Sequence, residues 1–471
     1  MDVLMVAAEL GPQARVTPAA DSIAALSKAM RQLGHQVTVA LPKSAGFEAA
    51  GMLLARRLSP LVLHSGLEVT VLDGQLASGV SLVLFDSPAF TENGPMFGAS
   101  GADESDAERA ALLASAAAAF VRERREHKKP FDIVHLHDWP AAPAAGLIRG
   151  EGAPPTVLTI HGLSEEKTFN PAAARLLGPA VDDARARVGQ RVSFLRLGML
   201  AARAVTTVSP SYADLLGRGP LSHTVAQLAE PIVGVLDGVD YAIFNPATDP
   251  GLESRFDAED PSNKGRCKTA LLRALELELV PERPLIVIFL DGMDPQGQRA
   301  LLAALPRILE LDVAVVAAGK TAAATAAELA RLRTSFAGDL AVSPKGEGVD
   351  LRRLVAGADF VLSAQGEVPC GHVQLVAQRY GALPVAEARG GMPDAVVDAD
   401  AELETGSGFL YGAGEEDALL GAVQRAVSAY ATSGFSRLRR RVMRRDLSWD
   451  RPARRYEQVY RRLLGDPSVG Q

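Results

Sequence analysis

The chain has 471 residues, of which 48% are apolar and 22% are charged, and this length predicts two or three domains with substantial cores. Its formal net charge of −7 excludes a broad basic surface, so nucleic acid is not an expected partner. The two cysteines are too few for a disulfide framework. The first residues lack the basic segment of a signal peptide, and the apolar runs are too short to span a membrane. We therefore expect a cytoplasmic protein without a membrane partner.

Short apolar runs alternate with helical patterns through the first half of the chain. An apolar stripe from Ile23 to Leu33 predicts a helix that Gly34 ends, and a second, longer helix is predicted over 106–127. The runs between the helices are continuously apolar, which is typical of parallel strands buried on both faces. These predicted strands are 3–8, 37–41, 80–85, 132–136, 156–160, 205–209 and 232–236.

A second series of the same kind follows in the other half. Strands are predicted at 284–290, 313–318, 359–363 and 383–387. The segment 244–265 is rich in Pro, Asp, Asn and Ser and is interpreted as a linker. The tail 436–464 is predicted to be helical, with its arginines on a solvated face. The sequence thus predicts two βαβ-type domains on either side of about residue 250.

Several loops that follow predicted strands carry polar residues. Ligands of open α/β sheets bind beyond the carboxyl ends of the strands. Asp138 lies at such an end and is a candidate hydrogen-bond acceptor for a polyol, and His161 follows the next strand, where a ligand role and a structural role both stay open. His135 and His137 have no further cluster of ligands at metal-binding spacing, so no metal site is predicted.

Two glycine-containing turns in the second half precede helical patterns. Pro369 suits a first helical turn, which would expose the N–H groups of the three residues from Cys370 to His372 to an anion or a sugar hydroxyl. Cys370 has no visible general base beside it, so it is interpreted as a packing residue. Gly390 and Gly391 form a second such turn.

The loop "ELGPQARVTPAAD" (9–21) has a structural interpretation of its own. Thr17 is a good N-cap residue, and Pro18 fits the first position of a helix. The loop therefore begins its helix well without any ligand.

Five motifs in chain order carry a resemblance to a known family. They are "HDW" (137–139), "TVSPSYA" (207–213), "GVLDGVDYAIFNPATD" (234–249), "PCG" with the later "RYG" (369–371 and 379–381) and "DLSW" (446–449). Together they resemble bacterial glycogen synthases and plant starch synthases over nearly the whole chain. The resemblance implies an α/β fold of the GT-B class, with two Rossmann-like domains, a cleft between them and a C-terminal helix that crosses back to the first domain.

The same resemblance implies domain limits and a reaction. Residues 1–245 would form the N-terminal, acceptor-side domain, 246–445 the nucleotide-sugar domain, and 446–471 the returning helix. The family transfers glucose from ADP-glucose to the non-reducing end of an α-1,4-glucan with retention, using neither a metal nor a cofactor. The implied partners are therefore a nucleotide sugar and an α-glucan.

Site residues follow from the match position by position. The catalytic candidates are His161, Asp138 and Glu367, the last being one residue out of step with the family motif. Asp237 stands where the family has Asn. The candidates for nucleotide-sugar binding are Arg15, Asp21, Asp237, Asp291, Gln296, Cys370, Gly371, Gly390 and Gly391.

The departures from the family pattern concentrate on the donor phosphates. Asp291 aligns with the family's Arg and Gln296 with its Lys. A negative charge therefore replaces one cation, and a neutral side chain replaces the other. Thr17 and Pro18 replace two glycines, and Arg15 replaces a Lys. The resemblance therefore predicts a glucosyltransferase with impaired turnover. Two alternatives stay open: a non-catalytic homologue that regulates by binding glucan or a partner synthase, and a transferase of this fold with another nucleotide sugar.

Overall fold

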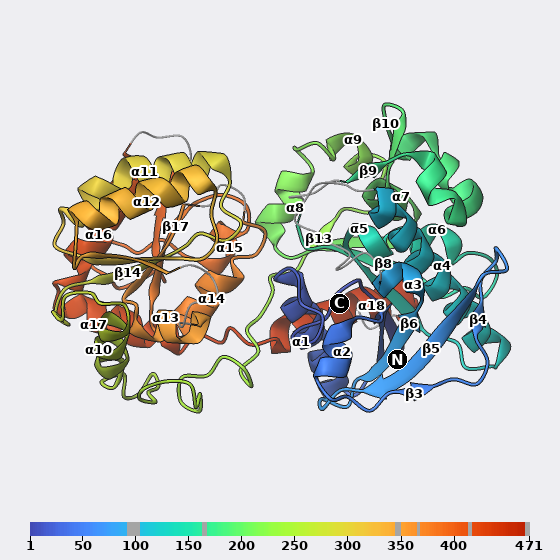
Figure 1. The fold of residues 1–471 in the computed structure, drawn as a ribbon. Helices are drawn as coiled ribbons and strands as arrows, with labels where there is room; N and C mark the ends of the chain where they lie inside the picture. The colour runs from blue at the N-terminus through green and yellow to red at the C-terminus, as the bar shows by residue number, and fades with distance from the viewer. Residues whose placement is uncertain (92–103, 163–166, 344–349, 365–367, 413–416, 467–471) are drawn as a thin grey trace. The chain divides into compact units, whose positions relative to one another are not determined.

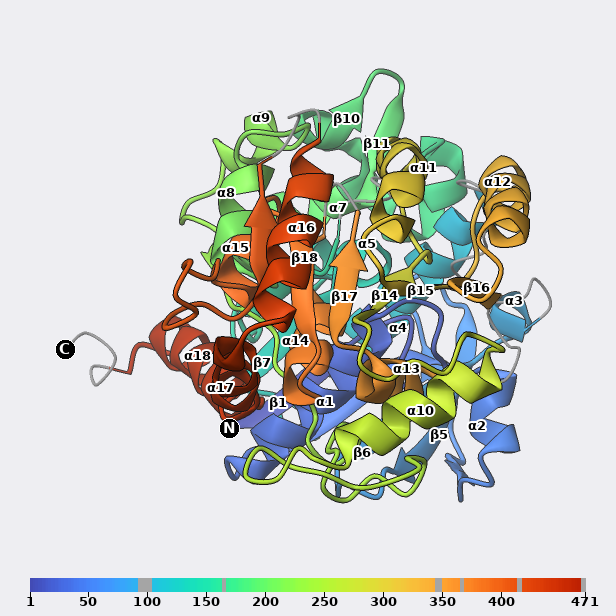
Figure 2. The same ribbon diagram turned by 90° about the vertical axis from the view of Figure 1, so that its left-hand side faces the viewer.

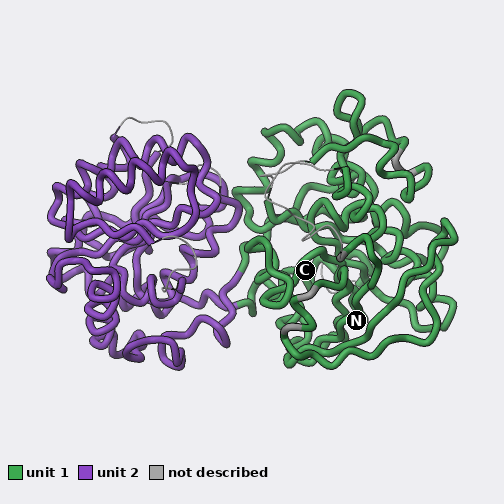
Figure 3. The backbone as a smooth tube through the Cα atoms, viewed as in Figure 1, with its two compact units in different colours: residues 1–237, 449–471 green, residues 238–448 purple. Residues whose placement is uncertain are grey.

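The computed structural model describes the chain except for residues 92–103, 163–166, 344–349, 365–367, 413–416 and 467–471. The chain forms two compact units, shown in Figure 3. Unit 1 contains Met1–Asp237 and Trp449–Gln471, and unit 2 contains Gly238–Ser448. The sequence had placed the corresponding limits after residues 245 and 445.

The main sheet of unit 1 is parallel over most of its width. Among the described residues its order is β13-β12-β8-β7-β1-β2-β6-β5-β3, with β4 beside β5, and β3, β4 and β5 join antiparallel at one edge. The strands of this sheet are β1 (Asp2–Val6), β2 (Gln36–Pro42), β3 (Ala55–Arg56), β4 (Leu61–Val62), β5 (Glu68–Gln75), β6 (Ser81–Asp86), β7 (Ile133–His137), β8 (Thr156–Ile160), β12 (Ala204–Thr207) and β13 (Val233–Gly234). A small sheet contains β9 (Thr168–Phe169), β10 (Arg187–Val188) and β11 (Arg191–Ser193). Every strand predicted in this half corresponds to one of the parallel strands.

Helices pack against the main sheet of unit 1. Helices α1 and α18 share one apolar core with β1, β2 and β6, and α4, α5, α6 and α7 contact one another in a separate layer (Figure 1). The helices of unit 1 are α1 (Ala19–Gln32), α2 (Ala45–Ala49), α3 (Pro88–Thr91), α4 (Glu104–Glu126), α5 (Asp138–Ala141), α6 (Ala144–Leu147), α7 (Phe194–Ala201), α8 (Pro210–Leu216), α9 (Ser222–Val225) and α18 (Asp450–Leu463), with 3-10 segments at Pro171–Asp182 and Ala184–Ala186.

The C-terminal tail returns to unit 1, although not as the single helix predicted over 436–464. Helix α17 (Ser433–Met443) ends in unit 2, and α18 begins only at Asp450. The break has a tertiary cause, because the N–H of Leu447 donates to the Tyr241 hydroxyl at 2.8 Å and its carbonyl accepts from the N–H of Val239 at 2.7 Å. Beyond the break, the aromatic face of α18 is buried in the core that α1 shares.

Unit 2 is built on a parallel sheet of six strands among its described residues. The strand order is β16-β15-β14-β17-β18-β19. The first strand, β14, lies in the centre, with β15 and β16 on one side and β17, β18 and β19 on the other, which is the Rossmann order. Helices α11, α12 and α16 cover one face, and α10, α13 and α14 cover the other (Figures 1 and 2). The strands are β14 (Leu285–Phe289), β15 (Ala314–Ala318), β16 (Leu340–Ser343), β17 (Phe360–Ser363), β18 (Leu383–Glu387) and β19 (Phe409–Tyr411). The remaining helices are α10 (Lys264–Ala274), α11 (Pro295–Leu309), α12 (Ala323–Ser335), α13 (Leu351–Gly357), α14 (His372–Arg379), α15 (Met392–Ala395) and α16 (Ala418–Tyr430).

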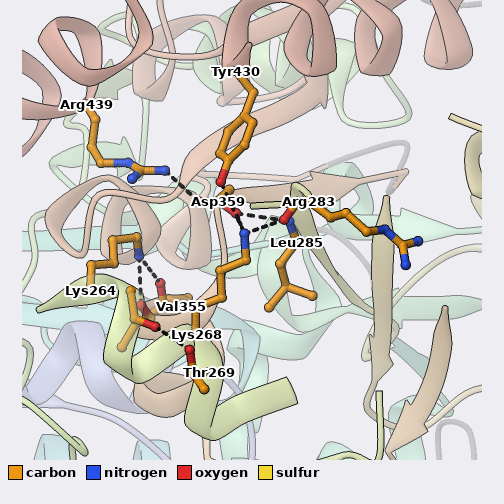
Figure 4. Close-up of polar contacts among 11 residues, drawn as sticks. Lys264, Lys268, Thr269, Arg283, Leu285, Val355, Asp359, Tyr430 and Arg439 are labelled. Atoms are coloured by element: carbon orange, nitrogen blue, oxygen red, sulfur yellow. Dashed lines mark hydrogen bonds and ion pairs between the residues drawn. The ribbon is translucent and has the colours of Figure 1, made fainter. Parts of the chain in front are cut away.

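Buried ionic groups tie these layers together at the amino ends of the strands, as Figure 4 shows. The Asp359 carboxylate, before β17, accepts from Lys268 at 2.6 Å, from Arg439 at 2.6 Å and from the N–H of Leu285 in β14 at 3.0 Å. The Lys264 ammonium donates to three backbone carbonyls at 2.9 Å each, which uses all three of its N–H groups. Asp359 therefore links β14 directly to β17, the pair at the centre of the sheet.

Two further expectations concern long segments. The predicted linker 244–265 contains no helix or strand before α10 begins at Lys264. Among the described residues, no helix is both long enough and apolar enough to cross a bilayer.

Candidate functional site

Each unit has one position where the strand order reverses, and ligands of open α/β sheets bind beyond the strand ends there. In unit 1 this point lies between β1 and β7, and in unit 2 it lies between β14 and β17. The loops and first helical turns that follow these four strands contain eight of the twelve predicted site residues. The other four, His161, Asp237, Gly390 and Gly391, follow the strands β8, β13 and β18.

The loop after β1 is closed by an acidic residue that sequence reasoning missed. One oxygen of the Glu9 carboxylate accepts the N–H groups of Val16 at 2.8 Å and Thr17 at 2.7 Å, and the Thr17 hydroxyl donates to the other oxygen. Burial raises the pKa of Glu9, and the bonds from Thr17 and Val16 oppose that shift. The N–H groups of Val16 and Thr17 are therefore engaged by the chain itself.

The start of α1 lies one residue later than predicted. The helix begins at Ala19, and Pro18 takes the N-cap position with helical dihedral angles. The Thr17 hydroxyl still accepts the N–H of Ala19, at 3.2 Å, so it satisfies one of the free donors of the first turn.

Three of the predicted nucleotide-sugar residues surround the first turns of α1. Arg15 pairs with Asp21 at 2.9 Å, and burial raises the pKa of Asp21 while Arg15 lowers it. The carboxylate of Asp237, which is 4% exposed, accepts a hydrogen bond from the Ser22 hydroxyl at 2.6 Å. The positive charge of Arg15 is thus already balanced by a neighbouring carboxylate.

Asp138 and His161 meet at the carboxyl ends of β7 and β8. An oxygen of Asp138 accepts the backbone N–H of His161 at 2.7 Å. Burial raises the pKa of Asp138 to about 8, against the opposing effect of backbone N–H groups, and burial lowers the pKa of His161 to about 4. Asp138 also has a left-handed backbone, with φ at 57°, a conformation that Asp tolerates better than most residues. At neutral pH the pair is a protonated carboxyl beside a neutral imidazole, suited to hydrogen bonding with hydroxyl groups.

In unit 2, the loop between β14 and α11 is acidic. The Asp291 side chain accepts the N–H of Lys320 at 3.3 Å and lies against Gly319, where a Cβ atom would come within 2.5 Å of it. Asp294 caps α11 by accepting the N–H of Gly297 at 2.6 Å. Gln296 is exposed in the first turn. Two carboxylates, those of Asp291 and Asp294, therefore lie in the loop that precedes α11.

The sequence missed the cap at Asp294, although Asp followed by Pro is a recognisable helix start. Glu387, at the end of β18, was also missed; burial raises its pKa, and Asp294 contributes in the same direction. No signal in the sequence indicated that these two carboxyl groups lie near each other.

The loops after β17 and β18 are brought together, with one correction. Gly371 has a left-handed backbone, with φ at 68°, so α14 begins at His372 and the predicted helical turn at Pro369 is wrong. The N–H groups at the start of α14 are consequently those of the residues from His372 onward. Cys370 is half-buried beside this turn, and Glu367 lies outside the described residues.

The turn at Gly390 and Gly391 packs directly on the loop after β17. The N–H of Gly391 donates to the carbonyl of Val368 at 2.7 Å. Gly390 has φ at 62°, and a Cβ atom there would lie 2.4 Å from the same carbonyl oxygen. Only glycine fits this close approach. A Cβ atom at Gly371 would likewise lie 2.4 Å from the Met392 side chain, which directly follows the turn, so the two glycine-containing turns are neighbours.

Comparison with known proteins gives the family of the chain. The family model for the starch synthase catalytic domain matches residues 2–226. A glycogen synthase of Anaeromyxobacter dehalogenans is 33% identical, with 98% of this chain and 99% of that protein covered, and one of Thermus thermophilus is 32% identical, with 99% and 100% covered.

Solved structures agree with this assignment. The catalytic domain of starch synthase IV from Arabidopsis thaliana, bound to ADP and acarbose, superposes with a TM-score of 0.87 at 26% identity and covers 98% of this chain and 99% of that one. The sucrose-phosphate synthase of Thermosynechococcus elongatus has a TM-score of 0.61 at 16% identity, with 98% of this chain and 99% of that chain covered, and shows the fold alone. The predicted GT-B architecture of two Rossmann-like domains is confirmed. The chain belongs to the family of bacterial glycogen synthases and plant starch synthases.

Proposed function

We propose that this chain is a retaining glucosyltransferase that moves glucose from ADP-glucose to an α-1,4-glucan, and that its turnover is impaired. Its relatives are glycogen synthases over almost their whole length, and a starch synthase of the same fold holds ADP and acarbose. The donor and the acceptor are assigned on that similarity. The impairment is assigned on this chain's own residues.

One observation carries the impairment: Asp291 stands at the exit of β14, beside the switch point of unit 2. A carboxylate there repels the diphosphate of a nucleotide sugar, whereas the family has a cation at the aligned position. Asp294, in the same loop, adds a second carboxylate at the helix start, and Gln296 contributes no charge. The loop is thus negative where the leaving group must be stabilised.

The expected penalty is large on the scale of catalysis. Removing one preorganised electrostatic stabiliser costs about 3–4 kcal/mol, or on the order of 10²–10³ in rate. Losing two does not simply double the cost, because groups that act together are not additive. We therefore expect the chain to transfer glucose slowly.

His161 and Asp138 are proposed to hold the glucosyl hydroxyls. Both lie at the ends of neighbouring strands and are fixed to each other by a 2.7 Å hydrogen bond. Burial keeps His161 neutral and Asp138 protonated near pH 7, so each carries a hydrogen-bond donor for a hydroxyl group. Glu367 is kept as a catalytic candidate on the family match.

The test is incorporation of labelled glucose from ADP-glucose and UDP-glucose into glycogen. The double variant Asp291→Arg, Gln296→Lys is compared with a control, Ala300→Lys, Glu310→Arg, which makes the same change of charge at exposed positions of the α11 region. We expect slow incorporation from ADP-glucose by the wild type, a gain of at least tenfold in the double variant, and little change in the control.

Three outcomes would count against this assignment. Wild-type turnover in the ordinary range of about 1–10³ s⁻¹ contradicts the impairment. Equal gains in the test and control variants mean that general charge, and not the loop after β14, limits donor binding. Absence of transfer in every protein contradicts the transferase assignment itself.

A second function is favoured by the same acidic loop together with the closed loop after β1. In that case the chain binds glucan, or a partner synthase, as a regulator without transferring glucose. Calorimetry separates the two functions. The regulator gives glucan binding without measurable ADP-glucose binding, and the transferase gives both.

A further inference from the structure

Three histidines of unit 1 form a row that runs from the C-terminal helix to the candidate site. His135 and His137 project from the same face of β7, with ring centroids 4.2 Å apart, and His161 lies 5.3 Å from His137 at the end of β8. His135 and His137 are at most 1% exposed. At the other end of the row, the hydroxyl of Tyr460 in α18 lies 2.6 Å from Nδ1 of His135.

Both ring nitrogens of His135 have a hydroxyl partner. Nε2 lies 2.5 Å from the Thr159 hydroxyl and Nδ1 lies 2.6 Å from the Tyr460 hydroxyl. The Thr159 hydroxyl in turn lies 2.6 Å from that of Thr206. Burial lowers the pKa of His135 to about 3, so the ring is neutral, with one nitrogen that donates and one that accepts.

The next contact joins Nδ1 of His137 to Nε2 of His161 at 3.0 Å, and one proton lies between them. Nε2 of His137 is buried without a hydrogen-bond partner among the described residues. An unpaired buried N–H is rarer in proteins than an unpaired acceptor. The proton of His137 therefore belongs on Nδ1, from which it is donated to His161.

We propose that His137 is a positioning residue that fixes His161 as the Nδ1–H tautomer, and that Tyr460 of α18 holds the row in place through His135. His161 then presents one defined donor, Nδ1–H, and no acceptor to a bound ligand. The use of that donor for a sugar hydroxyl rests on the proposed function, but the tautomer does not. The returning helix is in this way part of the support of the site.

The tautomer is measured directly by long-range proton–nitrogen NMR on protein labelled with ¹⁵N-histidine, with the signals of His161 assigned by their loss in His161→Gln. We expect a protonated Nδ1 and a bare Nε2 in the wild type. His137→Leu removes the donor and should give a mixture of tautomers at His161. His137→Asn retains an N–H near the former Nδ1 and should restore the wild-type pattern.

Tyr460→Phe tests the far end of the row. It removes one hydroxyl and keeps the ring, so Nδ1 of His135 loses its hydrogen-bond partner and its nitrogen signal should shift. A wild-type His161 protonated on Nε2 would overturn the proposal without any variant being needed. An unchanged His161 pattern in a folded His137→Leu would overturn it as well. Neither measurement uses transferase activity, so a failed glucan assay with the expected tautomer rejects only the proposed function.

Discussion

Replacing Asp359 by Asn tests how the central strands of unit 2 are held. The carboxylate balances Lys268 and Arg439, each at 2.6 Å, and accepts the N–H of Leu285 at 3.0 Å. Asn keeps one acceptor but no charge, so two cations remain buried or half-buried without a counterion. Breaking a buried pair in this way costs about 3–5 kcal/mol.

This cost is measurable as a thermal shift. For a unit of this size, 1 kcal/mol corresponds to about 2–4 °C, so the melting temperature of unit 2 should fall by roughly 6–20 °C. Both tryptophans, Trp139 and Trp449, belong to unit 1. Circular dichroism should therefore report the loss, while the tryptophan fluorescence transition should move less.

The matched control is Glu278→Gln. Its carboxylate pairs with Arg283 at 3.0 Å but is 63% exposed, and exposed pairs contribute at most about 1 kcal/mol. If Asp359→Asn shifts the melting temperature no further than this control, the ionic cluster does not hold β14 to β17.

Three further expectations can be measured on single variants. Burial raises the pKa of Asp138 to about 8, so the folded chain keeps a proton that the unfolded chain loses above pH 3.8. The free energy of unfolding of the wild type should therefore fall as the pH rises from 3.8 to 8, by less than ~1.4 kcal/mol per pH unit because the Asp138 residue is partly exposed. Melting curves of Asp138→Asn should lack this decline. Burial lowers the pKa of His135 to about 3, so stability should be lost as pH falls from 6.5 towards 3, and a wild-type acid profile no steeper than that of His135→Gln would contradict this. Gly390→Ala combines a left-handed backbone with a 2.4 Å approach to Val368 and should cost at least about 1–2 kcal/mol in urea unfolding, whereas Gly421→Ala, in an open position of α16, should be neutral or stabilising.

The sequence predicted the central parallel strands because strands buried on both faces are read directly from continuous apolar runs. It missed β16 and β19, the short strands at the two edges of the unit 2 sheet. In unit 1 it missed β3 and β4, which are only two residues long, and β5, whose alternation was not recognised. The division of the tail was also missed, because arginine-rich residues favour helix locally and the break depends on contacts of Leu447 with a distant segment.

For the candidate site, the sequence predicted which polar residues directly follow strands, but not which residues they pair with. Asp138 and His161 were chosen from their places after β7 and β8, and the structure joins them. Glu9 and His137 acquire their roles only through pairing with Thr17 and His161, which the fold brings within hydrogen-bond distance. Such pairings leave no periodic pattern in the chain.

The return of α18 to unit 1 has a consequence for synthesis on the ribosome. Tyr456 and Tyr460 complete the core beside β1 and α1, yet they are translated only after the whole of unit 2. All of unit 2 is made between Asp237 and this helix, which takes roughly 10–40 s at ordinary translation rates. During that interval His135 lacks the tyrosine hydroxyl, and the apolar residues of β1 and α1 that pack against α18 are uncovered. The nascent first unit therefore exposes the apolar surface of this core until α18 has been made, and such transiently exposed surface favours aggregation.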